Sequence, residues 1–225
     1  MKTLIWQDIR FQWKHGFYVV YAIITIFYLV LLSFVPKHWL DAAAAAVIFT
    51  DPTMLGFFFI GAIILFEKDQ GILRPLSVSP LLRRNYVLAK VLSLLVLTIL
   101  SSTVIHLGAA GFPKNTVLFI MAVSLSSIFF TLTGLIVSIF LSSVNQYLLA
   151  GALVITLLYV PLVDFFPPLS HPLWHAFPAR AAVNGLYPAA SEIPAVVSLA
   201  VMLLWGTAAY AVACICSKRL VGGIR

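Results

Sequence analysis

The sequence predicts an all-α membrane protein with six transmembrane helices and an N-terminal amphipathic helix on the membrane surface. Of its 225 residues, 62% are hydrophobic and only 9% are charged, and the mean hydropathy is +1.08. These values are typical of polytopic membrane proteins. Because a hydrocarbon core about 30 Å thick needs about 20 apolar helical residues per span, we expect a single transmembrane domain over residues 1–225, without length for a soluble domain.

The amphipathic helix is predicted over residues 1–15. Large apolar residues recur there every four positions, opposite a polar and charged face. The apolar positions are Ile5, Ile9, Trp13 and Phe17, and the polar ones are Lys2, Asp8, Arg10, Lys14 and His15. This periodicity favours a helix lying in the inner membrane interface.

Six apolar stretches follow, separated by turn signals rich in proline, glycine and charge. Asp51-Pro52 is typical of a helix start, so we favour a capping role for Asp51, the alternative being an acid that faces a solvated cavity. His106 and Asp164 are further polar residues in or near spans, and their pattern does not decide whether they line a pathway. The predicted spans are 16–35, 47–66, 86–107, 116–141, 147–166 and 195–216.

The long charged interruption at residues 66–90 is predicted to be an elbow between the second and third spans. It holds five of the fourteen Lys and Arg residues and two of the seven acids. Gly71 and Pro75 limit the helix length, and Ser79-Pro80 is typical of an N-cap followed by proline in the first helical turn. The expected structure is a compact cytosolic connection.

A second unusual stretch, residues 166–194, has six prolines from Pro167 to Pro194 and few charges. It is apolar but not long enough to span, so we expect an extracellular segment of short, partly re-entrant helices covered by protein. His171 and His175 lie four residues apart and are a candidate metal pair, but Pro172 lies between them and no glutamate accompanies them.

Basic residues indicate the orientation. Eleven of the fourteen Lys and Arg residues lie in the N-terminal segment, the elbow and the tail. The remaining three are Lys37, Lys114 and Arg180. The positive-inside rule therefore predicts that both termini and the elbow are cytosolic. The formal net charge of +7 then reflects contact with membrane lipids, not nucleic acid.

No catalytic motif is evident. The sequence has no phosphate-binding G-x-x-x-x-G-K-[ST], no H-E-x-x-H and no G-x-S-x-G pattern. The spacing of Cys214 and Cys216 points them to different sides of a helix, which disfavours a disulfide or metal pair. The distinctive chemistry of the chain therefore lies in the elbow.

The elbow sequence FEKDQGILRPLSVSPLLRR, with the six-span layout, resembles an ABC-2-type transporter permease. An acidic helix end precedes a Gly-x-Leu step, and a Ser-Pro-Leu turn precedes a basic helix start. Two positions depart from the usual pattern: Ile72 replaces a threonine and Leu82 replaces a serine. The matching positions are Glu67, Asp69, Gly71, Leu73, Val78, Ser79, Pro80, Leu81 and Arg84.

The resemblance implies the architecture of a type-2 ABC exporter permease in the bacterial plasma membrane. The elbow would be a coupling helix docked on a separate cytosolic ATPase, which would hold ATP and Mg²⁺, and a second permease would complete a homodimer or heterodimer. No cofactor is expected in this chain, and the cargo would be an amphipathic or hydrophobic drug, lipid or peptide. The implied coupling residues are Glu67, Lys68, Asp69, Gly71, Leu73, Arg74, Leu76, Val78, Ser79 and Pro80.

Two other classes of function stay open. A polytopic membrane enzyme would assemble a metal or acid-base site from His171 and His175, with Asp164 or Glu192. A channel or secondary carrier would use charges or broken helices near the bilayer centre. The predicted mid-span regions carry almost no charge.

Overall fold

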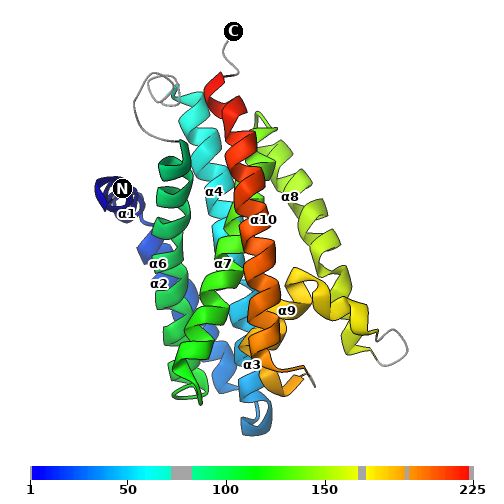
Figure 1. The fold of residues 1–225 in the computed structure, drawn as a ribbon. Coiled ribbons are helices and arrows are strands. Elements are labelled where there is room, and N and C mark those ends of the chain that lie inside the picture. The colour runs from blue at the N-terminus through cyan, green and yellow to red at the C-terminus, as the bar shows by residue number, and fades with distance from the viewer. Residues whose placement is uncertain (1, 72–82, 167–170, 191–192, 223–225) are drawn as a thin grey trace.

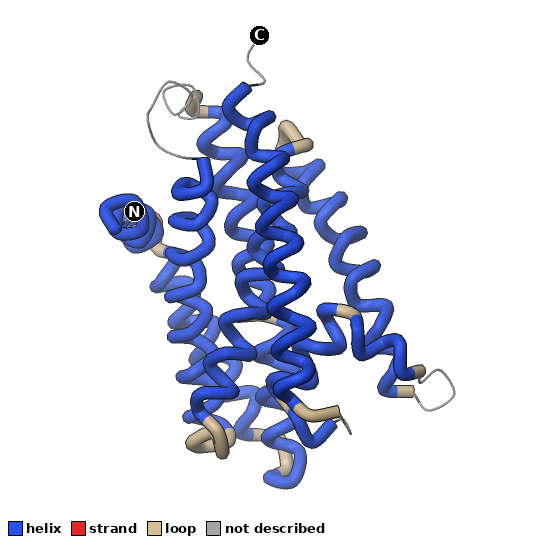
Figure 2. The backbone as a smooth tube through the Cα atoms, in the orientation of Figure 1, coloured by secondary structure: helices blue, strands red, loops and turns tan. Residues whose placement is uncertain are grey.

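The computed structural model describes residues 2–71, 83–166, 171–190 and 193–222, and within them every regular element is a helix (Figure 2). The all-α membrane fold class is therefore confirmed. The elements along the chain are α1 (Lys2–Lys14), α2 (Phe17–Ser33), η1 (Lys37–Trp39), α3 (Leu40–Thr50), α4 (Pro52–Asp69), α6 (Arg83–Ala109), α7 (Thr116–Ile139), α8 (Val144–Tyr159), η2 (Val160–Phe165), η4 (Pro172–Ala176), α9 (Pro178–Leu186), η5 (Pro188–Ala190) and α10 (Ala195–Gly222).

Five helical segments of the described chain are long and apolar enough to cross a membrane. A sixth candidate is the pair formed by α1 and α2, whose axes meet at 65° near Gly16. Gly16 has a φ of 77°, in the left-handed region that glycine adopts most easily. The bend separates α1 from α2, as the sequence predicts. The five segments are Lys37–Asp69, Arg84–Ala109, Thr116–Ile139, Val144–Phe165 and Ala195–Ser217.

The second span starts earlier than predicted. The sequence predicts residues 47–66, whereas the helical segment runs over Lys37–Asp69 and has its break at Asp51. Pro52 cannot donate to the carbonyl of Ile48, and the hydroxyl of Thr53 donates to that carbonyl instead. The hydroxyl of Thr98 on α6 donates to the Pro52 carbonyl at 3.1 Å. With these carbonyls satisfied, α3 continues into α4 across the proline.

Asp51 lies at the N-cap position of α4, but its side chain makes no capping hydrogen bond. Its carboxylate instead accepts a hydrogen bond from the Tyr21 hydroxyl at 3.2 Å. The predicted position of the cap is correct and the predicted role of the side chain is wrong, because a hydroxyl on α2 competes for the carboxylate.

The centre of the bundle is formed by α4, α7 and α10 (Figure 1). Gly134 on α7 allows α4 to approach closely, since a Cβ atom there would lie 2.5 Å from the Phe57 carbonyl oxygen. Thr131, one turn earlier, lies against Gly56 of α4 in the same way. This is the close helix approach that the small residues of the fourth span predict.

The ends of the bundle differ. The end of α4, the start of α6, the turn between α7 and α8 and the end of α10 lie together, and we call this the elbow end (Figure 1). The turns between α2 and α3 and between α6 and α7 lie at the opposite end. At that opposite end α9 packs against α7 and α10, and most of its residues are buried. The extracellular placement of residues 166–194 stays a prediction.

Candidate functional site

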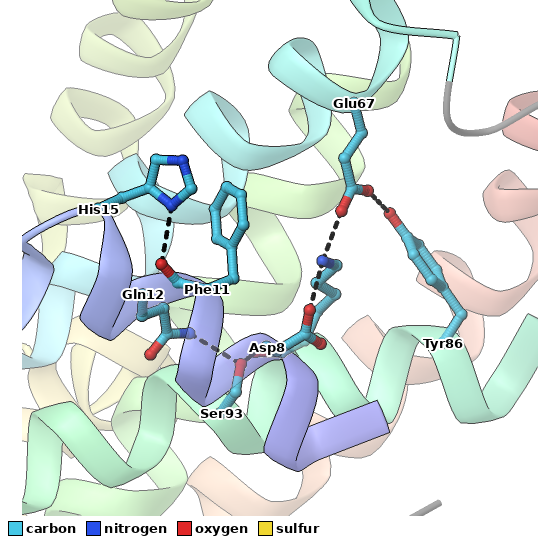
Figure 3. Close-up of polar contacts among 8 residues, drawn as sticks. Asp8, Phe11, Gln12, His15, Glu67, Tyr86 and Ser93 are labelled. Carbon is cyan, nitrogen blue, oxygen red and sulfur yellow. Dashed lines mark hydrogen bonds and ion pairs between the residues drawn. The ribbon is translucent and has the colours of Figure 1, made fainter. Parts of the chain in front are cut away.

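Helices α1, α4 and α6 meet at the ammonium group of Lys90, which lies between the labelled side chains of Asp8 and Glu67 (Figure 3). Lys90 Nζ lies 2.7 Å from Asp8 Oδ1 on α1 and 2.6 Å from Glu67 Oε1 on α4. The hydroxyl of Tyr86, one turn before Lys90 on α6, donates to the other Glu67 oxygen. We call Asp8, Glu67, Tyr86 and Lys90 the Lys90 cluster.

The Lys90 cluster holds one positive and two negative groups in a mostly buried place. The exposed fractions of the side chains are 7% for Lys90, 17% for Asp8 and 13% for Glu67. Burial raises the pKa of the Asp8 carboxyl above its ordinary value, and the Lys90 ammonium opposes this shift only in part. The cation is therefore needed to hold two carboxylates near each other, and its loss would leave both without a counter-charge.

Two further contacts fix α1 at this place. Gln12 is buried and donates to the Ser93 hydroxyl of α6 at 2.9 Å. The ring centroid of Phe11 lies 6.4 Å from the ring centroid of Phe66 at the end of α4. The polar face that the sequence assigns to α1 thus lies partly against the bundle, whereas Trp6 and Trp13 are 66% and 69% exposed. Helix α1, which is predicted to lie in the membrane interface, is thus also held by the Lys90 cluster against α4 and α6, the two helices that flank the elbow.

Of the predicted coupling residues, four lie within the described part of the chain. Glu67 belongs to the Lys90 cluster. Lys68 donates to the carbonyls of Ser138, Ile139 and Leu141 at 2.7, 3.0 and 2.8 Å, where a cation satisfies the free carbonyls at the end of α7. Asp69 is exposed.

Gly71 closes α4 with a φ of 68°, and no atom lies within 4 Å of where a Cβ atom would be. The prediction that Gly71 limits the helix is confirmed there. The other six positions, Leu73, Arg74, Leu76, Val78, Ser79 and Pro80, lie outside the described residues.

The opposite end of the bundle holds a second buried ion pair. Arg180 Nε on α9 lies 2.7 Å from Asp164 Oδ2 on η2, with exposed fractions of 4% and 3%. Arg180 also donates to Asn184 at 3.4 Å, and Asn184 donates to Ser198 of α10 at 3.0 Å. We call Asp164, Arg180, Asn184 and Ser198 the Arg180 cluster. Arg180, counted in the sequence as a charge of an outer loop, is in fact a core residue.

The candidate metal pair does not assemble in the described chain. His175 Nε2 lies 3.5 Å from Asp164 Oδ2, but His171 contacts Asp164 through its backbone N–H, at 3.2 Å. The His171 ring caps η4 by accepting from the Leu173 N–H. Among the described residues no group of three His, Cys, Asp or Glu side chains is placed to hold a metal ion. Glu192 lies outside those residues. The Asp164 carboxylate is engaged by Arg180, which disfavours it as a general base.

His106, also considered in the sequence, pairs with the turn that follows its own helix. Its Nδ1 lies 2.9 Å from the Gly111 carbonyl oxygen. Its ring meets Phe119 of α7 with centroids 4.8 Å apart. Both contacts are those of a packed residue near a turn.

The sequence matches a protein-family model along almost its whole length and two named proteins over about two thirds of it. A family model described as the fluoroquinolones export permease protein family matches residues 1–222. Two proteins called fluoroquinolones export permease protein, from two strains of Mycobacterium tuberculosis, are each 23% identical to the chain over 156 residues. That region covers 69% of this chain and 66% of each relative.

Proposed function

The chain belongs to the fluoroquinolones export permease protein family, and we propose that it is the membrane-spanning subunit of an ABC exporter. ATP and Mg²⁺ are held by a separate cytosolic ATPase that docks on the elbow at residues 66–90. Two permeases, identical or related, form the translocation pathway in the bacterial plasma membrane, with both termini cytosolic. The cargo is an amphipathic or hydrophobic compound, and the names of the relatives make fluoroquinolones the first candidates.

The observation that carries this proposal is the convergence of both elbow flanks on Lys90. Glu67 lies near the end of α4 and Lys90 near the start of α6, and their charged groups are 2.6 Å apart. Asp8 joins α1 to the same ammonium. A displacement of the elbow would move α4, α6 and α1 together, because separating them means breaking buried charge pairs. This is the property needed of a segment that transmits force from an ATPase to a pathway.

Exposed positions of the elbow make the cleanest docking probes. Reversal of Glu67 would disturb the Lys90 cluster as well as any docking surface, whereas Asp69 is exposed. We expect Asp69→Lys to weaken ATPase copurification, since a reversed charge at an interface rim opposes its partner. Asp41→Lys is the matched control, because Asp41 is an exposed acid at the opposite end.

Gly71→Val probes the shape of the elbow. Valine at a φ of 68° is strained by about 1–2 kcal/mol, and the strain falls where α4 enters the elbow. Gly111→Val is the control, because Gly111 has a φ of 80° and equally open surroundings in the turn after α6. The measurements are dimer yield, ATPase copurification from native cells, and substrate-stimulated ATP hydrolysis in proteoliposomes. The proposal is wrong if both elbow variants keep full copurification and coupling, or if the purified chain alone hydrolyses ATP.

A secondary carrier is the second candidate, favoured by one observation. The span over Lys37–Asp69 is broken at Asp51, and broken helices with an acid are typical of ion-coupled sites. A carrier would move its cargo under a proton gradient in vesicles without ATP. Transport that requires ATP and ignores the gradient would eliminate it.

A further inference from the structure

Asp51 differs from the other acids that the structure describes inside the bundle. Asp8 and Glu67 are paired with Lys90, and Asp164 is paired with Arg180. Asp51 is partly buried within a candidate span, and no Lys, Arg or His of the described chain forms an ion pair with it. An ionisable group inside a membrane without a counter-charge is costly and points to a function.

The partner of Asp51 is a tyrosine. The Tyr21 hydroxyl of α2 donates to its Oδ2 at 3.2 Å. Neutral donors stabilise a carboxylate but leave its negative charge uncompensated. In a low-dielectric setting this charge acts over several ångströms, since Coulomb energies are several times larger there than in water.

Tyr21 also lines a pocket of about 270 Å³ between α2 and α6. Most of its wall is aliphatic, with contributions from Ile26, Leu29 and Leu100. The aromatic side chains are Tyr18 and Tyr21, and the buried Tyr18 hydroxyl has no hydrogen-bond partner among the described residues. The pocket is open at the surface of the bundle, since Ile26 and Leu100 are 61% and 53% exposed. An apolar pocket with a few polar groups is the usual form of a small-molecule site.

We propose that this pocket binds a compound with an apolar ring system and one protonated amine, selected for its positive charge by Asp51 acting through Tyr21. The ring system lies among the aliphatic side chains. The amine lies at the Tyr21 end, where the tyrosine ring attracts cations and the carboxylate lies directly behind the hydroxyl. That this compound is the exported cargo rests on the proposed function, whereas its binding does not.

Three probes that share one ring system test the charge selection. They are 1-naphthylmethylamine, which is cationic at pH 7, the neutral 1-naphthylmethanol and the anionic 1-naphthylacetate. Binding to the full chain in nanodiscs is measured by naphthalene fluorescence. Ala22→Phe supplies the background from lipid, because Ala22 lines the pocket and a phenyl group there fills it. After this correction, the amine should bind about tenfold or more tightly than the alcohol, as expected for a charge-assisted interaction, and the carboxylate should bind most weakly.

Substitutions then assign the selection to its residues. Asp51→Asn keeps the shape and removes the charge, so it should lower amine affinity about tenfold and leave alcohol affinity unchanged. Tyr21→Phe keeps the aromatic ring and removes the hydroxyl, so it should reduce the preference for the amine over the alcohol. Asp41→Asn, an exposed acid on the same helical segment, should preserve it.

Three outcomes would overturn the inference. The first is equal affinity of the native chain for amine and alcohol, which would describe an apolar gap filled by lipid chains. The second is a preference that survives Asp51→Asn. The third is no binding beyond that of Ala22→Phe. Each of these leaves ATPase copurification intact if the proposed function is correct, and loss of copurification with retained amine selection would contradict only the proposed function.

Discussion

The Lys90 cluster and the Arg180 cluster both stabilise charges buried in an apolar bundle, but they pair these charges differently. Among the described residues, the Arg180 cluster pairs the Arg180 cation with the Asp164 carboxylate, both almost fully buried, and its amide and hydroxyl groups extend the network to α10. The Lys90 cluster pairs one cation with two carboxylates that are slightly more exposed. Of the described charges, Arg180 and Asp164 are almost fully buried, whereas the Lys90 cluster has one more carboxylate than cations and is slightly more exposed.

This difference indicates different roles. The Arg180 cluster joins η2, α9 and α10 at the opposite end, where short helices need polar partners for their backbones and side chains. The Lys90 cluster joins α1 to the flanks of the elbow. An unbalanced, partly exposed cluster costs less to rearrange than a sealed pair. We therefore expect rigidity at the Arg180 cluster and adjustable coupling at the Lys90 cluster.

The largest effect is expected from Arg180→Met. It leaves the Asp164 carboxylate buried without its cation, which should destabilise the fold by about 3–5 kcal/mol. The measurement is thermal unfolding of the detergent-solubilised protein followed by tryptophan fluorescence. The double variant Arg180→Met with Asp164→Leu should recover most of the loss, because no charge then stays unpaired. A single variant as stable as the native chain would show that the pair is dispensable.

A smaller stability loss and a larger functional loss are expected from Lys90→Met. The two carboxylates left behind are close enough to the surface to gain water or protons, so the cost should be about 2–3 kcal/mol, below that of a sealed pair. Coupled ATP hydrolysis should fall severalfold in proteoliposomes while the ATPase still copurifies. Lys37→Met, which removes an exposed cation at the opposite end of the bundle, is the control for general loss of charge. If hydrolysis stays fully coupled in Lys90→Met, the cluster is structural only.

The comparison also shows what sequence reasoning reaches. Hydropathy and turn signals predict the helices because each span carries its own pattern over about 20 residues. Ion pairs have no such local pattern. Lys90 and Asp8 are 82 residues apart in the chain, and Arg180 and Asp164 are 16 apart. Their pairing depends on which helices become neighbours, and local patterns of hydropathy and turn residues do not reveal this.

The helix start at Asp51 shows a different limit. The Asp-Pro signal predicts the break correctly, but it does not reveal that Thr53 and Thr98 bind the carbonyls at the break and let α3 continue into α4. The elbow prediction is only partly informed by the structure. Glu67 and Lys68 bind within the permease, and the residues from Leu73 to Pro80 lie outside the described chain. Their contact with an ATPase stays a prediction.

The smallest effect, and the sharpest comparison with Arg180, is expected from Asp8→Asn. This change removes the excess acid and keeps a hydrogen-bond acceptor for Lys90, so it should change the stability at pH 7 by less than about 1 kcal/mol.

The pH dependence of the stability shows whether burial or the Lys90 ammonium dominates at Asp8. Because the pKa of Asp8 is raised by burial in the folded state, the folded chain binds a proton more readily than the unfolded chain does. This contribution to stability is complete below the unfolded pKa of about 4 and is lost as the pH rises through the higher folded value. Unfolding temperatures measured from pH 7 down to pH 4.5 should therefore shift in favour of the native chain relative to Asp8→Asn. A shift in the opposite direction would mean that Lys90 outweighs burial, and the cluster would then resemble the tight pair at Arg180.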